Sequence, residues 1–425
     1  MSRARRRIVM SGQMLGVLAL LFALTLASPM GAFGDQNKKK KADSKEAAKK
    51  TGVVDYSRIV WPNPPAIARV KYKNWYASDT VQRTTQGKVN KKSGWMDRLA
   101  GTQSDQEVYK LPFSLVEPYG VAVDSKGNLY VADQKVGAIF IFGTDSETRK
   151  VDLIKNGTHA HFVRIIGLAM DDSDRLFVSD PGLRHVLVFD KDHKAEDVIS
   201  EGMVTPGGLA IDTQNRFLYV TDPDLDQVLV YDADTYKLLR KMGTTGHKHE
   251  LTTPGDFSKP AGVAVDHEGN VYVADTWNDR IEIFDADGQF ISAFGKSGDG
   301  PGYLARPKGV AIDSDNNIWV ADGMQDRVQV FNREGQLLIS IGGHGLLPGQ
   351  FQGLVGITID KQNRVFTTEI YPGRAQEFQY VTNAEAEAQR KERENARTKG
   401  TTANNKTDDP AKSTAPVATT APPKQ

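Results

Sequence analysis

The clearest hydrophobic pattern in the chain lies between Lys259 and Gly295, where four short apolar runs are separated by turns. The runs cover residues 262–266, 271–275, 280–285 and 290–295. Each is rich in β-branched or aromatic side chains, which is typical of strands on a half-buried sheet. Because Gly and Asp in the turns favour tight antiparallel connections, the segment predicts a four-stranded up-and-down sheet.

This unit recurs along the chain. The glycine that opens its first strand has counterparts at intervals of 47, 41, 54, 47 and 47 residues, which gives Gly120, Gly167, Gly208, Gly262, Gly309 and Gly356. An aspartate follows each glycine by four residues, and a second acid follows it by 13 or 14 residues. One sheet cannot bury both of its faces alone, and a period of 40–50 residues with four strands is typical of a propeller blade. The sequence therefore predicts an all-β, six-bladed β-propeller of four-stranded antiparallel blades.

The repeated motif resembles the NHL repeat. The best copies are residues 260–295 and 307–342, with good copies at 118–143 and 205–232 and degraded ones at 163–190 and 354–381. The resemblance covers roughly residues 115–381 and implies an NHL-type propeller of an exported bacterial kind. It implies little about activity, because the same fold hosts enzymes, receptors and RNA-binding proteins.

The last copy lacks a fourth strand, because the chain turns polar at Thr382. Before the first copy, residues 66–76 alternate between apolar and polar side chains and follow a Pro-rich segment. We expect residues 66–76 to form the outer strand of the last blade, which would remove the free edge and close the ring. Residues 79–115 then form a long excursion with a short amphipathic helix, within a propeller that spans 53–381.

The two ends of the chain differ in composition from the repeats. Four arginines precede an apolar run from Met14 to Ala27 and a short stretch of small residues, which predicts a secretory signal peptide over residues 1–34. Residues 35–52 are Lys-rich and predict a flexible linker. From Ala384 the sequence starts as a possible charged helix and becomes a Thr/Pro/Lys/Ala tail, so we expect residues 382–425 to be disordered.

Composition narrows the function. The formal net charge is +1, which gives no whole-molecule basic field and argues against nucleic acid as a partner. The chain has no Cys, which excludes disulfides, thiolate metal sites and haem attachment through Cys. With the signal peptide, we expect an exported protein, periplasmic or secreted, that is a monomer and meets membranes only through an uncleaved N-terminus or the Lys-rich linker.

Strand polarity places the turns between second and third strands on the same face as the loops between blades, and we call this face the rim face. The second acids lie near it: Asp133, Asp180, Asp222, Asp275, Asp322 and Glu369. Such a ring could hold a cation. Since an acid repeated in every blade is more often a structural tie for a turn, we expect that role for it, with Glu369 as the exception to the Asp pattern.

Basic and aromatic residues share the rim face. We expect a partner-binding rim made of Tyr119, Arg184, Trp277, Arg280, Lys308, Arg327 and Arg374. The residues that precede the six glycines should also face the rim, and they are varied and largely apolar: Tyr119, Ile166, Gly207, Ala261, Lys308 and Val355. Such a surface suits docking of a protein or peptide better than acid–base chemistry.

Histidines in the loops between blades are the alternative. His159, His161, His247, His249 and His344 fall on the rim face, where a propeller enzyme could gather zinc or calcium ligands. His161, His249, His344 and Glu369 are the candidate ligands. Two enzyme families share the scaffold. Peptidyl-hydroxyglycine amidating lyases bind zinc through histidines, and at the matching places this chain has Asp256 and Lys308, which cannot replace a neutral imidazole. For gluconolactonase-like propellers, Glu369 and nearby Asp residues are candidates.

These patterns predict an exported, non-enzymatic binding or scaffold protein without catalytic residues or a cofactor. It would engage a protein or other extracytoplasmic partner through the rim face. The alternative is a metal-dependent lyase or lactone hydrolase with a site over the central channel. No Gly-x-Ser-x-Gly, His-Glu-x-x-His or phosphate-binding loop is present.

Overall fold

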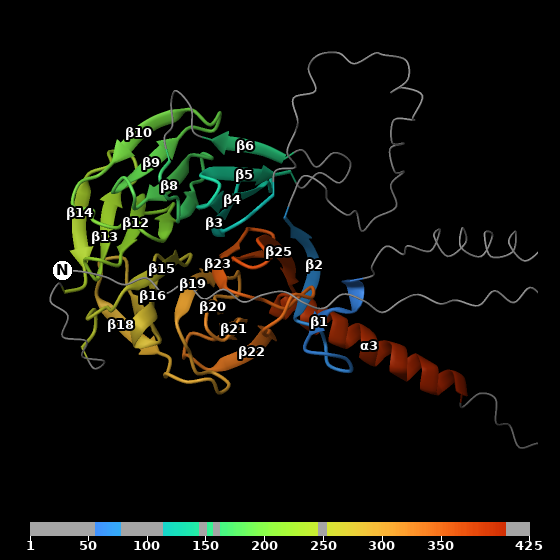
Figure 1. Ribbon diagram of the computed structural model, residues 1–425. Helices are drawn as coiled ribbons and strands as arrows, with labels where there is room; N and C mark the ends of the chain where they lie inside the picture. The colour runs from blue at the N-terminus through green and yellow to red at the C-terminus, as the bar shows by residue number, and fades with distance from the viewer. Residues whose placement is uncertain (1–55, 78–113, 144–150, 156–161, 245–252, 405–425) are drawn as a thin grey trace, which may run out of the picture. The chain divides into compact units, whose positions relative to one another are not determined.

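The computed structural model of the protein describes residues 56–77, 114–143, 151–155, 162–244 and 253–404. Within them the chain forms six antiparallel sheets, five with four strands and one with five (Figure 1). The six-bladed β-propeller predicted from the repeats is confirmed. The predicted signal peptide, the Lys-rich linker and nearly all of the 79–115 excursion lie outside the described residues.

The two inner strands of each blade are the most regular. The first strands, which line the central channel, are β3 (Pro118–Val123), β7 (Leu168–Met170), β11 (Leu209–Asp212), β15 (Pro260–Val265), β19 (Pro307–Ile312) and β23 (Leu354–Ile359). The second strands are β4 (Leu129–Asp133), β8 (Leu176–Asp180), β12 (Phe217–Asp222), β16 (Val271–Asp275), β20 (Ile318–Asp322) and β24 (Arg364–Glu369). The second strands are almost fully buried because neighbouring blades cover both of their faces.

The outer strands complete the blades. The third strands are β5 (Ala138–Phe142), β9 (His185–Phe189), β13 (Gln227–Asp232), β17 (Arg280–Phe284), β21 (Arg327–Phe331) and β25 (Arg374–Tyr380). The fourth strands are β6 (Val151–Lys155), β10 (Ala195–Ile199), β14 (Leu238–Met242), β18 (Phe290–Phe294), β22 (Leu337–Gly342) and β2 (Val70–Tyr76). Several fourth strands alternate between covered and exposed side chains, as the edge of a blade requires.

The core is divided into six apolar clusters, one between each pair of neighbouring blades. The cluster between the last and first blades joins Phe366 of β24 and Ala375 of β25 to Phe140 and Phe142 of β5. Because this cluster is as well formed as the other five, the blades make a continuous ring. Each blade is stabilised by apolar surface that it shares with both neighbours.

β2 closes the ring, as expected for residues 66–76. It pairs antiparallel with β25 in the register Val70↔Tyr380, Tyr72↔Phe378 and Tyr76↔Ala375, so a strand from before the first repeat lies beside the last strand of the propeller (Figure 1). The short strand β1 (Val60–Trp61) adds a fifth strand outside β2, and the 3-10 turn η2 (Tyr56–Arg58) precedes it.

The chain after the propeller differs from the expected disorder at residues 382–425. Helix α3 (Asn383–Asn404) begins directly after β25. The Thr382 hydroxyl accepts a hydrogen bond from the Glu385 backbone N–H, and the Glu385 carboxylate accepts one from the Thr382 backbone N–H. These two bonds form a capping box at the helix start. The side chain of Ala386 is buried, and Asp315 accepts a hydrogen bond from the Asn383 amide. The helix therefore starts where a cap and two contacts with the propeller hold its first turn.

None of the helices in the described part of the chain has a stretch long and apolar enough to cross a membrane.

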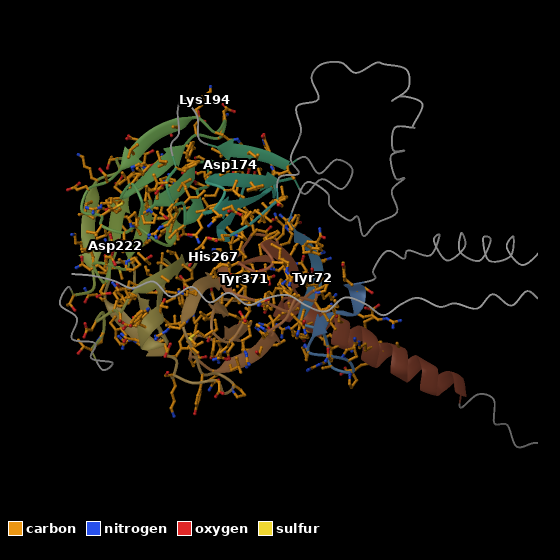
Figure 2. All side chains as sticks on the ribbon, viewed as in Figure 1. Tyr72, Asp174, Lys194, Asp222, His267 and Tyr371 are labelled. Carbon is orange, nitrogen blue, oxygen red and sulfur yellow. The ribbon has the colours of Figure 1, made fainter. Side chains whose placement is uncertain are left out.

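Tyr72 tests how much the closing strand contributes to stability. Tyr72, which is labelled in Figure 2, is 3% exposed. Its ring centroid lies 5.4 Å from that of Phe378. Tyr72→Ala should lower the free energy of unfolding by about 3 kcal/mol, because it leaves a cavity in the apolar cluster between the last two blades. The exposed neighbour Lys73 supplies the control, and Lys73→Ala should change it by less than about 0.5 kcal/mol. Equal urea midpoints for the two variants would show that β2 is not part of the cooperative unit.

Candidate functional site

A cavity of about 250 Å³ occupies the rim-face end of the central channel. Its lining includes all six residues that precede the strand-one glycines, namely Tyr119, Ile166, Gly207, Ala261, Lys308 and Val355. The expectation that these positions face the rim is confirmed. One residue from each blade thus contributes to one cavity, which exists only because the ring is closed.

A second cavity, of about 330 Å³, occupies the opposite end of the channel. The two cavities share six apolar lining residues, each directly after a strand-one glycine: Val121, Leu168, Leu209, Val263, Val310 and Ile357. We call this ring the waist. It separates a largely apolar cavity on the rim face from one whose lining includes Asp124, Asp171, Asp172 and Asp360. The inner end of the rim-face cavity is therefore lined by apolar side chains.

The polar groups of the rim-face cavity are few. Lys259 and Lys308 are its charged lining residues, and His, Asp and Glu are absent from the lining that the described residues form. Burial lowers the pKa of Lys308, and the positive charge of Arg306 lowers it further. Burial also raises the pKa of Tyr119. This cavity can accept an apolar or anionic group, and the lining that the described residues form contains no carboxylate.

The ring of second acids is structural, as expected. Each of the six carboxylates is fully buried and accepts hydrogen bonds from backbone N–H groups of the loop that precedes its blade. Asp133, for example, accepts bonds from Val116, Glu117, Lys135 and Val136, so one side chain fixes an inter-blade loop and a turn together. Burial raises the pKa of Asp322 to about 6, and the bonded amides oppose that shift.

Two arginines of the expected rim are buried inside the blades. Arg280 pairs with Asp275 at 2.8 Å, and Arg374 pairs with Glu369 at 2.6 Å. In each pair the acid and the arginine face each other across adjacent antiparallel strands. Both arginines also donate hydrogen bonds to loop carbonyls. These side chains hold the loops and are buried, with 8% of Arg280 and 4% of Arg374 exposed. The five-residue spacing of acid and arginine across a tight turn was the available sequence signal.

The other expected rim residues remain accessible to different degrees. Trp277 is 59% exposed and follows β16 in the 3-10 turn η3 (Thr276–Asn278). The guanidinium carbon of Arg306 lies 4.8 Å from the Trp277 ring centroid, so Arg306 belongs to this surface although the sequence analysis missed it. Tyr119 and Lys308 line the cavity together with Trp277. Arg184 is exposed in a turn, and Arg327 is half-buried at the start of β21.

Exposed apolar side chains gather on the rim face. Among the described residues, nine of the fourteen large exposed apolar side chains lie in inter-blade loops or in turns between second and third strands. They are Val116, Val136, Val163, Trp277, Tyr303, Met324, Leu346, Leu347 and Tyr371. The other five lie on fourth strands, at Val198, Leu239, Phe290, Ile291 and Leu338. The turns of the opposite face contribute no member of this set in the part of the chain that is described.

Two of the four candidate metal ligands, His344 and Glu369, lie within the described residues. His161 and His249 lie outside the described residues, as do His159 and His247. His344 contacts Asp326 at 2.7 Å, and Glu369 is held by Arg374 and Gln376. The described residues contain no group of three His, Asp or Glu side chains placed to hold a metal ion. The described lining of the rim-face cavity, with Lys308 in it, therefore does not fit a divalent cation.

Comparison with known proteins gives matches to two families. Residues 170–296 match the SMP-30/Gluconolactonase/LRE-like region, and residues 304–331 match the NHL repeat. Protein brain tumor of Drosophila melanogaster is 50% identical over 44 residues, which are 10% of this chain and 4% of that protein. Protein lin-41 of Caenorhabditis elegans is 53% identical over 38 residues, 9% of this chain and 3% of that protein. The chain thus spans only a few per cent of the length of these curated relatives.

Two solved structures are similar to this chain at low sequence identity. A gluconolactonase from Xanthomonas campestris has a TM-score of 0.48 and 23% identity, covering 63% of this chain and 86% of that chain. A streptogramin B lyase has a TM-score of 0.47 and 11% identity, covering 63% of this chain and 94% of that chain. The chain is a six-bladed β-propeller, and parts of its repeat region match the NHL repeat and the SMP-30/Gluconolactonase/LRE-like region.

Proposed function

We propose that this propeller is a non-enzymatic binding or scaffold module that docks a protein partner on its rim face. The observation that carries the proposal is the gathering of nine large exposed apolar side chains on that face, around a largely apolar cavity. Clustered apolar side chains that face solvent mark interaction sites, because their burial against a partner is favourable.

The chemistry of the rim face supports a protein partner. Aromatic residues, Met and Arg are enriched at the centres of protein interfaces, and Trp277, Met324, Tyr371 and Arg306 supply these types. The carboxylates that could have served catalysis are instead buried and bonded to backbone amides. The rigid ring holds the docking residues in fixed positions, which reduces the entropy cost of binding.

We further propose that the partner is met outside the cytoplasm. The support is the N-terminal sequence, in which Arg3, Arg5, Arg6 and Arg7 precede the apolar run from Met14 to Ala27. The intact mass of the protein recovered from the envelope fraction should correspond to removal of residues 1–34. A full-length mass there would contradict removal of this segment.

Site-specific photo-crosslinking tests the docking face. A benzophenone amino acid placed at Trp277, Met324 or Tyr371 should crosslink one and the same partner in cells. The matched controls are Ile291 and Leu338, which are also exposed apolar residues but lie on fourth strands. We expect the Trp277→Ala, Met324→Ala double variant to remove the crosslink from Tyr371 while the fold, followed by circular dichroism, is unchanged. Equal crosslinking from control and rim positions would overturn the proposal.

A metal-dependent lactone hydrolase or lyase is the second candidate, favoured by the match of residues 170–296 to the SMP-30/Gluconolactonase/LRE-like region. The rim-face histidines His161, His249 and His344 would supply ligands. Elemental analysis of protein purified without chelators separates the two functions. We expect less than stoichiometric zinc and calcium. One equivalent of either, lost in a His161→Ala, His249→Ala, His344→Ala triple variant, would favour the enzyme.

A further inference from the structure

Lys308 is a cation at the centre of the proposed docking face that has no counter-ion. It is the second residue of β19, follows Pro307 and lines the rim-face cavity. Within the described part of the chain, its ammonium group has no ion pair or hydrogen bond. Its charged neighbour is Arg306, which carries the same sign. A partly buried lysine without a partner is unfavourable, so an anion in the cavity would be stabilising.

Lys259 and the two threonine hydroxyls of the cavity already have partners. Lys259 pairs with Asp224 at 3.1 Å, and the Thr205 hydroxyl donates to the same carboxylate at 2.5 Å. The Thr276 hydroxyl donates to the Pro307 carbonyl at 2.8 Å. Lys308 therefore remains as the cation that is available to a ligand, and apolar side chains surround it.

The shape of the cavity restricts what can enter. The waist lines its inner end with six apolar side chains, of which Val310 comes from β19 and Ile357 from β23 of the next blade. A cavity of about 250 Å³ at one end of the central channel has room for the terminal residue of a chain. An occupant that satisfies both the waist and Lys308 has an apolar body and a carboxylate attached to it.

We infer that the rim-face cavity receives the C-terminal residue of the partner, with its free carboxylate accepting a hydrogen bond from the Lys308 ammonium and its apolar side chain packed on the waist. This inference rests on the proposed protein-docking function and specifies the part of the partner that is recognised. Capture of a terminal carboxylate is a known mode of peptide recognition, and here the recognising group is a side chain.

Short peptides test the inference directly. The probes are acetylated tripeptides that end in Leu, Ile, Val or Phe, each prepared with a free C-terminal carboxylate and with a C-terminal amide. Calorimetry should detect binding of at least one free acid, and its amide should bind about tenfold or more weakly. Lys308→Met should weaken binding of the acid by a similar factor and abolish discrimination between the two forms.

Lys296→Met is the matched control, because Lys296 is an exposed lysine on the same face and is not part of the cavity lining. We expect it to bind the free acid as the wild type does. Equal affinity for acid and amide, full binding by Lys308→Met, or no binding of any tripeptide would each overturn the inference. Binding of octanoate but of no peptide would also overturn it, since the ligand would then be a small carboxylate.

The photo-crosslinks from Trp277 and Met324 separate this inference from the function on which it rests. If those crosslinks persist in Lys308→Met, the docking face stands and the carboxylate inference depends on the peptide data alone. If wild-type rim positions do not crosslink a partner, the docking function fails whatever the peptides show.

Discussion

The close approach of neighbouring blades at six glycines is the constraint on which the rest of the structure depends. A Cβ atom added to any of them would come within 3.0 Å of a backbone carbonyl oxygen of the next blade. These glycines are Gly120, Gly167, Gly208, Gly262, Gly309 and Gly356. Side chains of the second strands reinforce the contact, as when Ser179 donates to the Gly207 carbonyl and Thr221 to the Ala261 carbonyl. Glycine is needed here for the space it leaves, and the channel is narrow as a result.

The contact between blades that closes the ring also positions the residues of the candidate site. Gly356 of the last blade faces the Tyr119 carbonyl of the first blade, and Thr368 donates a hydrogen bond to that oxygen. The residue before each glycine then faces the rim, and the residue after it forms the waist. A cavity lined by all six blades therefore follows from the same contact that closes the ring. The buried acids beneath it hold the inter-blade loops that carry the exposed apolar side chains.

The regular features of the molecule could be predicted from the sequence, because they repeat. The glycine spacing predicted the blades, the missing fourth strand predicted the role of β2, and the acid in every blade predicted a structural tie. Features that occur only once or twice in the chain were harder to predict from the sequence. Arg280 and Arg374 were predicted to face a partner, but register places them against buried acids. Arg306, the apolar residues of the rim face and the capping box of α3 were missed, since only the folded ring shows which turns share a face. The placement of His161 and His249 on the rim face stays a prediction, because both lie outside the described residues.

The most direct test of this account is a comparison of two glycines. Gly262 meets the next blade, whereas an added Cβ at Gly300 would make ordinary contacts of 3.6 Å or more with Tyr303, and its backbone is not left-handed. Urea unfolding should show Gly262→Ala destabilised by about 1–3 kcal/mol, because the blades must move apart. Gly300→Ala should be unchanged or more stable by up to about 1 kcal/mol. If Gly262→Ala were as stable as Gly300→Ala, close approach at the glycines would not be what holds the ring together.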